Sequence, residues 1–399
     1  MKDYYLLTSE SVTEGHPDKL CDIISDTLLD AFLSKDPSSH IALETMASNQ
    51  TVFVAGEVAS AATVDVVKTV REAIIDVGYD SKEKGLDGKE CLVLTNIGVQ
   101  SPDIARGVSL ADGSIGAGDQ GMMYGYACDD TEECMPLSIS LAHKLTKRLT
   151  KVRKDGILSY LYPDGKSQVT VAYDSRGNVL GVKDVVISAQ HNAAISMEEL
   201  RADIKTKVID AVIDEKDMLP DVKIHINPTG RFVVGGPEGD TGLTGRKIIV
   251  DTYGGIARHG GGAFSGKDPT KVDRSAAYMA RYAAKNLVKA GFCRKCEINL
   301  AYAIGIPEPV SVRIDTFETE EIPKALIELI TKDVFDFSVA GIIKNLSLTT
   351  VSYKSTAAYG HFGRPELNLP WERTDKVENL QQKAATYMAD AFFKHREKR

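Results

Sequence analysis

The chain has 399 residues, of which 43% are hydrophobic and 26% are charged, and its formal net charge at pH 7 is −8. This composition is typical of a soluble globular protein of about two or three domains, and the acidic balance argues against a nucleic-acid-binding protein. No stretch approaches the ~18 consecutive apolar residues of a membrane span, and the start, MKDYYLLTSES, lacks the features of a signal peptide. We therefore expect a cytoplasmic protein with small anionic ligands.

The first chemical motif, EGHPDK at 14–19, leads into an expected helix, because apolar side chains recur with helical period over 20–32. Pro17 suits the first turn of that helix, which places His16 at the N-terminus, where free amides favour anions. Asp18 would offer a carboxylate to a divalent cation. An ordinary helix cap with exposed charges explains this segment equally well.

Two alternating strands are expected at 40–47 and 51–59, joined by a tight turn at 48–50. Glu44 and Glu57 interrupt these otherwise apolar strands. A strand glutamate usually faces water, but such a pair can also mark a site for a cation or an ammonium group. The next expected elements are a helix at 63–77 and a buried strand at 91–98.

The segment 100–118 has no hydrophobic period and is rich in Gly, Ser and Asp, so we expect a long loop that acts as a lid. It runs into GAGDQG at 116–121, which has the spacing of a dinucleotide-binding loop. No hydrophobic strand precedes this motif, and the strand-like MMYGYA follows it where a helix would be required. We therefore reject a dinucleotide-binding interpretation.

A helix is expected at 136–152, followed by a turn, YPDGK, at 162–166 and an alternating strand at 167–173. Asp164 and Lys166 place an acid and a lysine at the edge of that strand, although a plain turn is the simpler explanation. The elements expected next are a strand, a helix and a strand, at 179–189, 198–213 and 222–227.

The segment 230–273 has the densest concentration of glycine and cationic side chains in the chain. Glycine lets the backbone approach a ligand closely, and the lysines and arginine supply positive charge, so we expect a polyphosphate site. GGAFSGKD at 261–268 comes near the phosphate-loop pattern, but Asp268 stands where a hydroxyl belongs and the strand-like run 247–251 ends too early. A flexible linker would be richer in Ser and Pro. The cations expected to contact the polyphosphate are Arg246, Lys247, Lys267 and Lys271.

The remainder of the chain is expected to form helices and strands, at 268–289, 297–304, 309–316 and 377–395, with two further helices before the last. Six cysteines include one close pair, CRKC at 293–296. A structural zinc site needs about four ligands, and no second pair accompanies this one. We expect reduced, structural thiols.

Several of these runs resemble one family, the methionine adenosyltransferases (S-adenosylmethionine synthetases), over essentially the full length of the chain. The matching runs are EGHPDK at 14–19, GAGDQG at 116–121, INPTGRF at 226–232, GRK at 245–247, GGGAFSGKD at 260–268 and YGHFG at 359–363. The resemblance implies an α+β fold of three βαβ-like α/β-sandwich domains related by pseudo-threefold symmetry. The expected domains are interleaved, with approximate limits 1–115, 116–236 and 237–399.

The resemblance also implies an activity, in which the sulfur of L-methionine attacks C5′ of ATP to form S-adenosylmethionine. The displaced tripolyphosphate is then hydrolysed to phosphate and diphosphate. A thioether needs no general base, which suits a chain rich in cations without a nucleophile–base pair. The implied cofactors are two Mg²⁺ per site and one K⁺ per subunit, and the implied assembly is a homodimer or a dimer of dimers (homotetramer) with shared active sites.

Residue roles follow from the same resemblance. Catalytic roles are implied for His16, at the bond-breaking oxygen, and for Lys166, Arg246, Lys267 and Lys271 around the phosphates. ATP binding is implied for His16, Asp164, Lys166, Arg231, Phe232, Asp240, Arg246, Lys247, Ala263 and Lys267. Methionine binding is implied for Glu57, Gln100, Asp119, Asp240, Lys271 and Ile304. The implied metal ligands are Asp18 and Asp273 for Mg²⁺ and Glu44 for K⁺.

Two other functions stay open on the sequence alone. An ATP-dependent kinase or ligase would also need cationic loops around a polyphosphate. A non-catalytic nucleotide-binding module would need the same loops, but not Asp18 and Asp273 together with Glu57 and Gln100.

Overall fold

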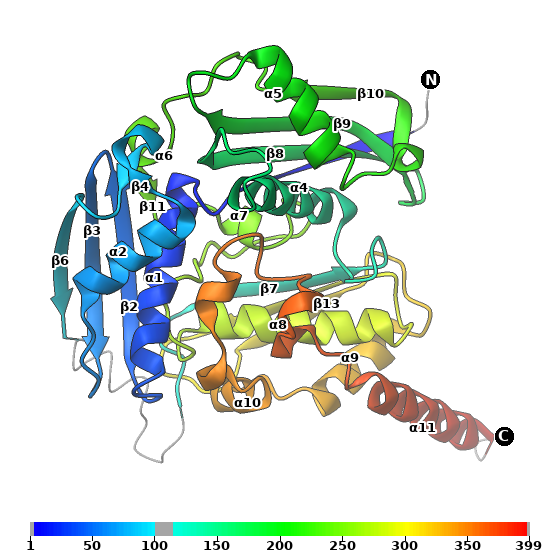
Figure 1. Cartoon of the computed structure of the whole chain (residues 1–399). Coiled ribbons are helices and arrows are strands. Elements are labelled where there is room, and N and C mark those ends of the chain that lie inside the picture. Colours follow the sequence, from blue (N-terminus) through cyan, green and yellow to red (C-terminus); the bar gives the residue numbers. More distant parts are fainter. Residues whose placement is uncertain (1–3, 100–114, 397–399) are drawn as a thin grey trace.

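The computed structural model describes residues 4–99 and 115–396, with side chains as far as residue 390. It contains three open sheets of three or four strands and one short two-stranded ribbon, and helices pack against each of the three sheets (Figure 1). The predicted α+β class is confirmed. Gln100 and most of the expected lid, residues 100–114, lie outside the described residues.

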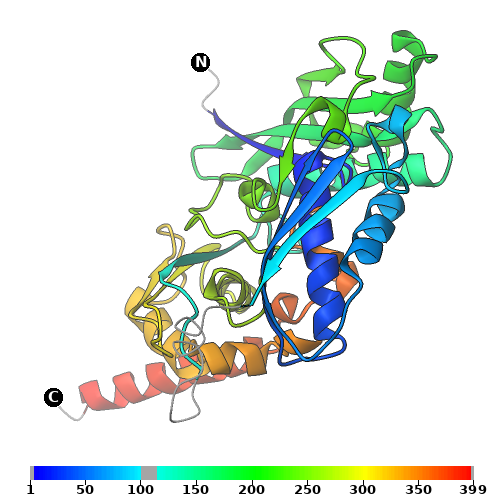
Figure 2. The same cartoon turned by 90° about the vertical axis from the view of Figure 1, so that its left-hand side faces the viewer.

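The first sheet has the strand order β11-β2-β3-β6, and its strands are Gly242–Leu243, His40–Ser48, Thr51–Ala59 and Leu92–Gly98. The predicted hairpin is confirmed, with Asn49 at a φ of 50° in its turn. Helices α1 (Pro17–Leu33) and α2 (Val66–Val77) lie on the same side of these strands in both views (Figures 1 and 2). Alternate apolar residues of β2 and β3 are buried beneath them.

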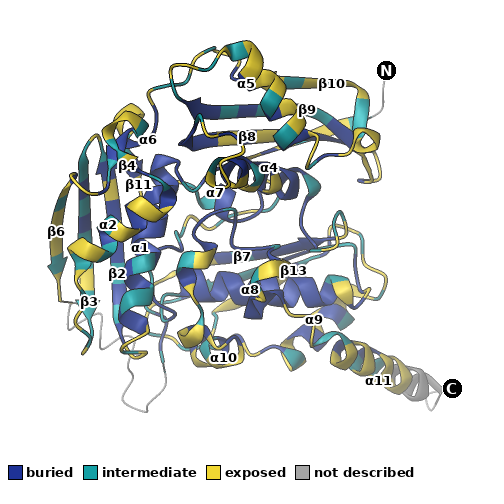
Figure 3. Ribbon diagram, viewed as in Figure 1, coloured by how far each residue is buried: buried dark blue, intermediate teal, exposed yellow. Residues whose placement is uncertain are grey.

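The strand predicted at 91–98 forms, but the prediction that it is buried is wrong. Leu92 and Leu94 of β6 are 54% and 45% exposed. Most residues of this strand are exposed or intermediate (Figure 3). The reason is that β6 lies at the edge of its sheet and α1 and α2 cover only one face. The strand register places Leu94 beside Phe53 and Met46 on the uncovered face.

The second sheet has the order β1-β8-β9-β10, with strands Tyr4–Val12, Leu161–Asp174, Val179–His191 and Met218–Ile226. No strand was expected at the position of β1. The helix predicted at 136–152 is confirmed as α4 (Leu137–Lys154), which packs against β1 and β8. Helix α5 (Met197–Ile204) passes into a π-helical turn, Lys205–Ile209, so the helix expected at 198–213 is shorter than predicted.

The turn predicted at 162–166 is wrong, because these residues belong to β8. Lys166 pairs with Val12 of β1, and the pairing with β9 shifts register between Leu161 and Gly165. β9 pairs with β8 at Leu161 and Gly165, and β1 joins it at Lys166, so the partners of this stretch come from segments that the local sequence could not reveal. Asp164 and Lys166 therefore lie inside a strand.

The third sheet has the order β13-β12-β7, with strands Ser311–Asp315, Lys295–Tyr302 and Gly121–Cys128. β7 confirms that a strand follows GAGDQG. Helix α8 (Val272–Lys289) packs closely on this sheet, since a Cβ on Gly125 would lie 2.0 Å from the Ala280 carbonyl carbon. The remaining elements are β4 (Asp80–Ser81), β5 (Leu86–Asp87), α6 (Gly236–Gly239), α7 (Ile248–Asp251), α9 (Lys324–Val334), α10 (Val339–Asn345) and α11 (Val377–Arg396).

The chain crosses repeatedly between sheets, because β1 pairs with β8, β7 with β12 and β11 with β2. Segments far apart in the sequence thus meet in every sheet. The domain limits near 115 and 236 stay a prediction. Among the described helices none is long and apolar enough to cross a membrane.

Candidate active site

His16 caps the N-terminus of α1 and is almost completely buried. Its Nδ1 accepts the amide of Asp18 at 3.1 Å. Burial, together with the charges of Lys247 and Lys166, lowers the pKa of His16 to about 3. The ring is therefore neutral at pH 7, and because Nδ1 acts as an acceptor, Nε2 carries the proton. Such an imidazole can donate one hydrogen bond to an anion.

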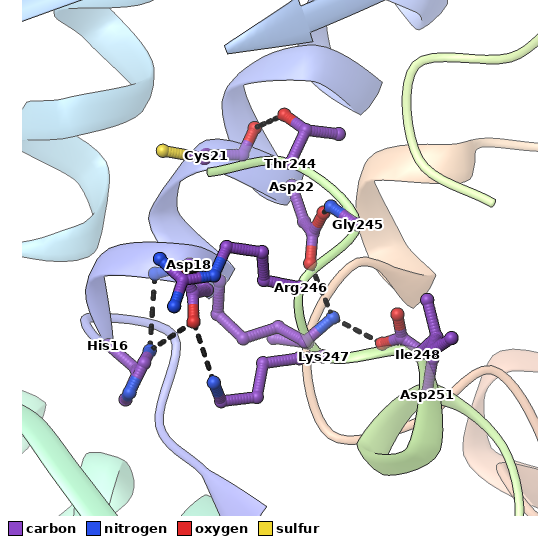
Figure 4. A network of polar contacts seen from close by, with 12 residues as sticks. His16, Asp18, Cys21, Asp22, Thr244, Gly245, Arg246, Lys247, Ile248 and Asp251 are labelled. Atoms are coloured by element: carbon purple, nitrogen blue, oxygen red, sulfur yellow. Dashed lines mark hydrogen bonds and ion pairs between the residues drawn. The ribbon is translucent and has the colours of Figure 1, made fainter. Parts of the chain in front are cut away.

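Asp18 holds the segment that carries Arg246 and Lys247 (Figure 4). Its carboxylate accepts Lys247 Nζ at 2.6 Å and the amide of Leu243 at 3.0 Å, and Arg246 Nε lies 3.9 Å away. Burial raises the pKa of Asp18, but the hydrogen bond and charge of Lys247 outweigh this effect and lower the pKa on balance. A carboxylate and two cations thus meet at the helix N-terminus.

The strand-like interpretation of 247–251 is wrong, because this run forms the short helix α7. The Asp251 amide donates to the Lys247 carbonyl oxygen at 2.9 Å, which closes a helical turn. The turn returns the chain to α1, where the Asp251 carboxylate accepts the ammonium group of Lys19.

Asp164 and Lys166 extend this first group of charges. Asp164 is buried, and burial raises the pKa of its carboxyl to about 6. One oxygen accepts the Gly236 amide at 2.9 Å, and the other has no partner within the described part of the chain. Lys166 is exposed, and its charge acts on both Asp164 and His16. The unpaired oxygen of Asp164 is itself buried.

A second group of charges surrounds the start of α8. Lys267 Nζ donates to Asp273 Oδ2 at 2.7 Å, and Lys271 donates to the buried carboxylate of Asp268. Asp268 also accepts the Ile41 amide at 2.6 Å. Asp268, which stands where a phosphate loop has a hydroxyl residue, therefore fixes this segment to β2.

Glycine allows the backbones of the two groups to approach each other. A Cβ on Gly245 would lie 2.5 Å from Ala263 Cβ, and a Cβ on Gly262 would lie 2.1 Å from Asp273 Oδ1. Gly245 also has a φ of +79°, which disfavours other residues. Yet across residues 4–99 and 115–396 no hydrogen bond or ion pair joins the charged side chains of the first group to those of the second. The charged side chains thus form two separate groups, which we call the first and second half-sites.

The other predicted residues lie outside both groups. Arg231 is exposed and donates to the Ala193 carbonyl at 3.3 Å, and the Phe232 amide donates to His191 Nε2 at 3.0 Å. Asp240 is exposed, and its charge acts on Asp164. Four further predicted residues are exposed, namely Glu44, Glu57, Asp119 and Ile304. No contact within the described part of the chain connects them to either group.

Three family models match successive parts of this chain. They describe the N-terminal, central and C-terminal domains of S-adenosylmethionine synthetase and match residues 4–102, 114–232 and 234–373. The chain belongs to the S-adenosylmethionine synthetase family. Membership assigns it the synthesis of S-adenosylmethionine, with ATP and methionine as substrates.

All three matched domains of the synthetase contribute to the first half-site. His16 and Asp18 lie in the N-terminal match, Asp164 and Lys166 in the central match, and the Gly245–Lys247 segment in the C-terminal match. The second half-site lies in the C-terminal match alone. The first half-site therefore forms only where three domains meet, whereas the charged residues of the second all come from one domain.

Sequence reasoning missed a set of buried charges beneath both half-sites. Asp22, Asp26 and Asp251 are buried, as is Arg274, which pairs with Asp26. The sequence does contain a signal for Asp22 and Asp26, because aspartates recur at every fourth position of the helix, at 18, 22, 26 and 30, and so lie on one face. No local pattern announces Asp251 or Arg274.

The described residues, 4–99 and 115–396, contain no group of three or more His, Cys, Asp or Glu side chains arranged to hold a metal ion. All six cysteines are free and buried, as structural thiols would be.

Proposed function

We propose that this synthetase joins its substrates by a single displacement. The sulfur of L-methionine attacks C5′ of ATP, the C5′–O bond breaks, and its electron pair leaves with the triphosphate oxygen. The observation that carries the proposal is the neutral, buried His16 with Lys166, Arg246 and Lys247 around it. Family membership supports the overall reaction, and this half-site supports its mechanism.

The mechanism needs charge stabilisation more than acid–base chemistry. Methionine sulfur attacks without losing a proton, so alignment and neutralisation of the leaving triphosphate carry the catalysis. His16 Nε2–H donates to the bridging oxygen as negative charge develops there. A neutral donor suits this role, because it needs no proton transfer and keeps its charge state across the physiological pH range.

Hydrolysis of the tripolyphosphate is the second proposed step. Arg246, Lys267 and Lys271 are proposed to hold the polyanion while water attacks a terminal phosphorus. Lys267 and Lys271 each face a carboxylate in the free chain. These carboxylates keep the lysines in place before substrate arrives. A polyphosphate would then replace them as partners of the lysines.

Mg²⁺ fits this chain as a cofactor held partly by substrate. It usually binds through one or two carboxylates together with substrate phosphates, so a cluster of three protein ligands is not required. Asp18 and Asp273 are the proposed ligands of two ions per site, and each faces a lysine that a phosphate could engage instead. Bound Mg²⁺ would neutralise charge on the triphosphate. One K⁺ per subunit is proposed at Glu44, which is exposed on β2.

A homodimer, or a dimer of such dimers, is proposed to complete the active site. The uncovered face of the first sheet exposes Met46, Leu92 and Leu94, and the strand register places Glu44 and Glu57 on the same face. A second copy on this face would bury the apolar side chains and bring the glutamates to a neighbour's half-site. The separation of the two half-sites in one chain supports the arrangement, in which Lys166 and Lys267 of one site come from different chains.

Product analysis tests the proposal. The purified protein is incubated with ATP, L-methionine, Mg²⁺ and K⁺, and the products are separated by chromatography and mass spectrometry. We expect a sulfonium product with equal amounts of phosphate and diphosphate, and no sulfonium product without methionine. Formation of ADP or AMP in place of the sulfonium would indicate a kinase or ligase, and binding without turnover would indicate a nucleotide-binding module.

A further inference from the structure

Helix α1 carries an aspartate at every fourth position, Asp18, Asp22, Asp26 and Asp30. Residues at this spacing lie on one face of a helix, and like charges there repel each other. Burying a carboxylate also costs free energy unless it is paired and hydrogen-bonded. A helix with this stripe therefore needs donors from other parts of the chain, and the identity of those donors indicates what the stripe does.

Asp22 binds the backbone of the first half-site. Its Oδ1 accepts the amide of Gly245 at 2.8 Å, directly before Arg246 and Lys247 (Figure 4). Its Oδ2 accepts Lys19 Nζ at 2.7 Å, and Lys19 also donates to Asp251. The segment is thus held at both ends, through Gly245 at its start and through Asp251 at the end of α7.

Asp26 binds the backbone of the second half-site in the same way. Its Oδ1 accepts the amide of Gly266 at 2.9 Å, directly before Lys267. The guanidinium of Arg274 binds both carboxylate oxygens, at 2.7 and 2.8 Å, and donates to the Lys267 carbonyl at 3.2 Å. A Cβ on Gly266 would lie 1.9 Å from the Leu43 carbonyl oxygen, so the turn has no room to shift toward β2.

We propose that Asp22 and Asp26 are positioning residues, through which α1 fixes the two half-sites of one chain relative to each other. The two carboxylates are one helical turn apart, a rise of about 6 Å along the axis. Neither needs to touch substrate, since each acts through a backbone amide. The inference rests on the proposed function, because it assumes that the two half-sites bind the phosphates. Misplacement by about 1 Å in such a site can cost about a hundredfold in rate.

Asp30 provides a matched control on the same face of the helix. Its carboxylate accepts the amides of Tyr353 and Lys354 at 2.8 and 3.0 Å and the hydroxyl of Ser352 at 2.9 Å. It therefore anchors a segment as Asp22 and Asp26 do, but that segment contains no predicted site residue.

The experiment compares Asp22→Asn, Asp26→Asn and Asp30→Asn in the full-length protein, with the three alanine variants as stronger perturbations. Asparagine preserves shape and one acceptor oxygen but removes the charge that strengthens the amide hydrogen bond. Amide hydrogen exchange is measured by mass spectrometry for peptides covering 242–247 and 264–268. Melting temperature, kcat and the KM for ATP are measured on the same samples.

We expect exchange to rise about tenfold at 242–247 in the Asp22 variants only, and at 264–268 in the Asp26 variants only. Turnover at saturating substrate should fall about a hundredfold in the alanine variants and about tenfold in the asparagine variants, with a smaller change in KM. The Asp30 variants should keep both exchange patterns and stay within about threefold of parental turnover.

The positioning role is overturned if the folded Asp22 and Asp26 variants keep parental exchange in both segments. It is also overturned if the Asp30 variants lose as much turnover at an equal drop in melting temperature, because the effect would then be general destabilisation. Exchange is measured without substrate, so it decides this inference even if the parental protein forms no sulfonium product. Failure of the parental protein to form a sulfonium product would overturn the proposed function alone.

Discussion

Lys267 Nζ lies 2.7 Å from Asp273 Oδ2, so a predicted phosphate ligand and a predicted magnesium ligand are paired in the free chain. The first half-site repeats the relationship, with Lys247 Nζ 2.6 Å from Asp18 Oδ2. Each pair keeps a cation and a carboxylate ordered without leaving a buried charge alone. On the proposed function, a polyphosphate that arrives with Mg²⁺ would supply a new partner for both members of each pair. The two ion pairs would then hold these charges in place for a ligand that carries both signs.

Removal of the His16 side chain should slow adenosyl transfer specifically. Loss of one transition-state donor typically costs about 10²–10³ in rate, or roughly 3–4 kcal/mol. His16→Ala should therefore lower kcat by that factor while the affinity for ATP changes little. Single-turnover kinetics and equilibrium ATP binding separate the two effects. His225→Ala, at an exposed histidine of β10, serves as the control, and equal transfer rates in the His16 variant and parent would contradict the role.

Arg246 should matter most for the polyphosphate. Its guanidinium is exposed and close to Asp18, where it can bind an anion at little desolvation cost. A hydrogen bond to a charged group contributes about 1.5–3 kcal/mol, so Arg246→Ala should slow hydrolysis of added tripolyphosphate at least about tenfold. Phosphate release measures this directly. Arg313→Ala, at an exposed arginine of β13, should behave as the parent, and parental hydrolysis by the Arg246 variant would place that residue outside the site.

A charge on the uncovered sheet face should dissociate the proposed dimer. Leu94 is 45% exposed in the single chain and would be buried against a second copy. Leu94→Lys should therefore give a monomer by light scattering and lose turnover. Leu6→Lys changes a residue of β1 that is 46% exposed on another sheet, and it should leave the oligomer unchanged. A Leu94 variant with the parental mass would rule out this face as the interface.

Complementation between inactive variants should reveal shared active sites. Lys166 and Lys267 belong to different half-sites, and we expect each active site to take one half-site from each chain. Mixing Lys166→Ala with Lys267→Ala under conditions of verified subunit exchange should restore activity, because a mixed dimer contains one parental site. Neither variant alone should gain activity under the same treatment. Absence of recovery after exchange would favour sites built within one chain.

Buried His143 should make stability depend on pH. Burial, with the charges of Arg364 and Lys19, lowers the pKa of His143 to about 3, against about 6.5 for an unfolded histidine. Between these values the unfolded chain binds one more proton there, so the free energy of unfolding falls as pH falls, by about 1.4 kcal/mol per pH unit. Urea unfolding at pH 7, 6 and 5 should give a shallower dependence for His143→Gln. His225→Gln should keep the parental slope, and equal slopes in all three proteins would contradict the assignment.

Much of this fold could be predicted because its signals are local. The hairpin at 48–50, the helix after Pro17 and the strand after GAGDQG follow from hydrophobic period and turn chemistry, and all three are confirmed. The errors occur where a distant segment decides the outcome. β9 pairs with β8 on both sides of the turn predicted at 162–166, and the uncovered sheet face leaves β6 exposed.

The sequence by itself determined which residue types carry the chemistry, because the glycine and cation pattern of 230–273 and the EGHPDK motif depend on a few adjacent positions. Only the tertiary structure decided how these residues are held. Hydrogen bonds join Asp22 to Gly245 and Asp26 to Gly266, across more than two hundred residues of chain. The neutral state of His16 likewise depends on burial and on charges from β8 and the Gly245–Lys247 segment. Burial and contact between distant segments are properties of the folded chain, and no local pattern encodes them.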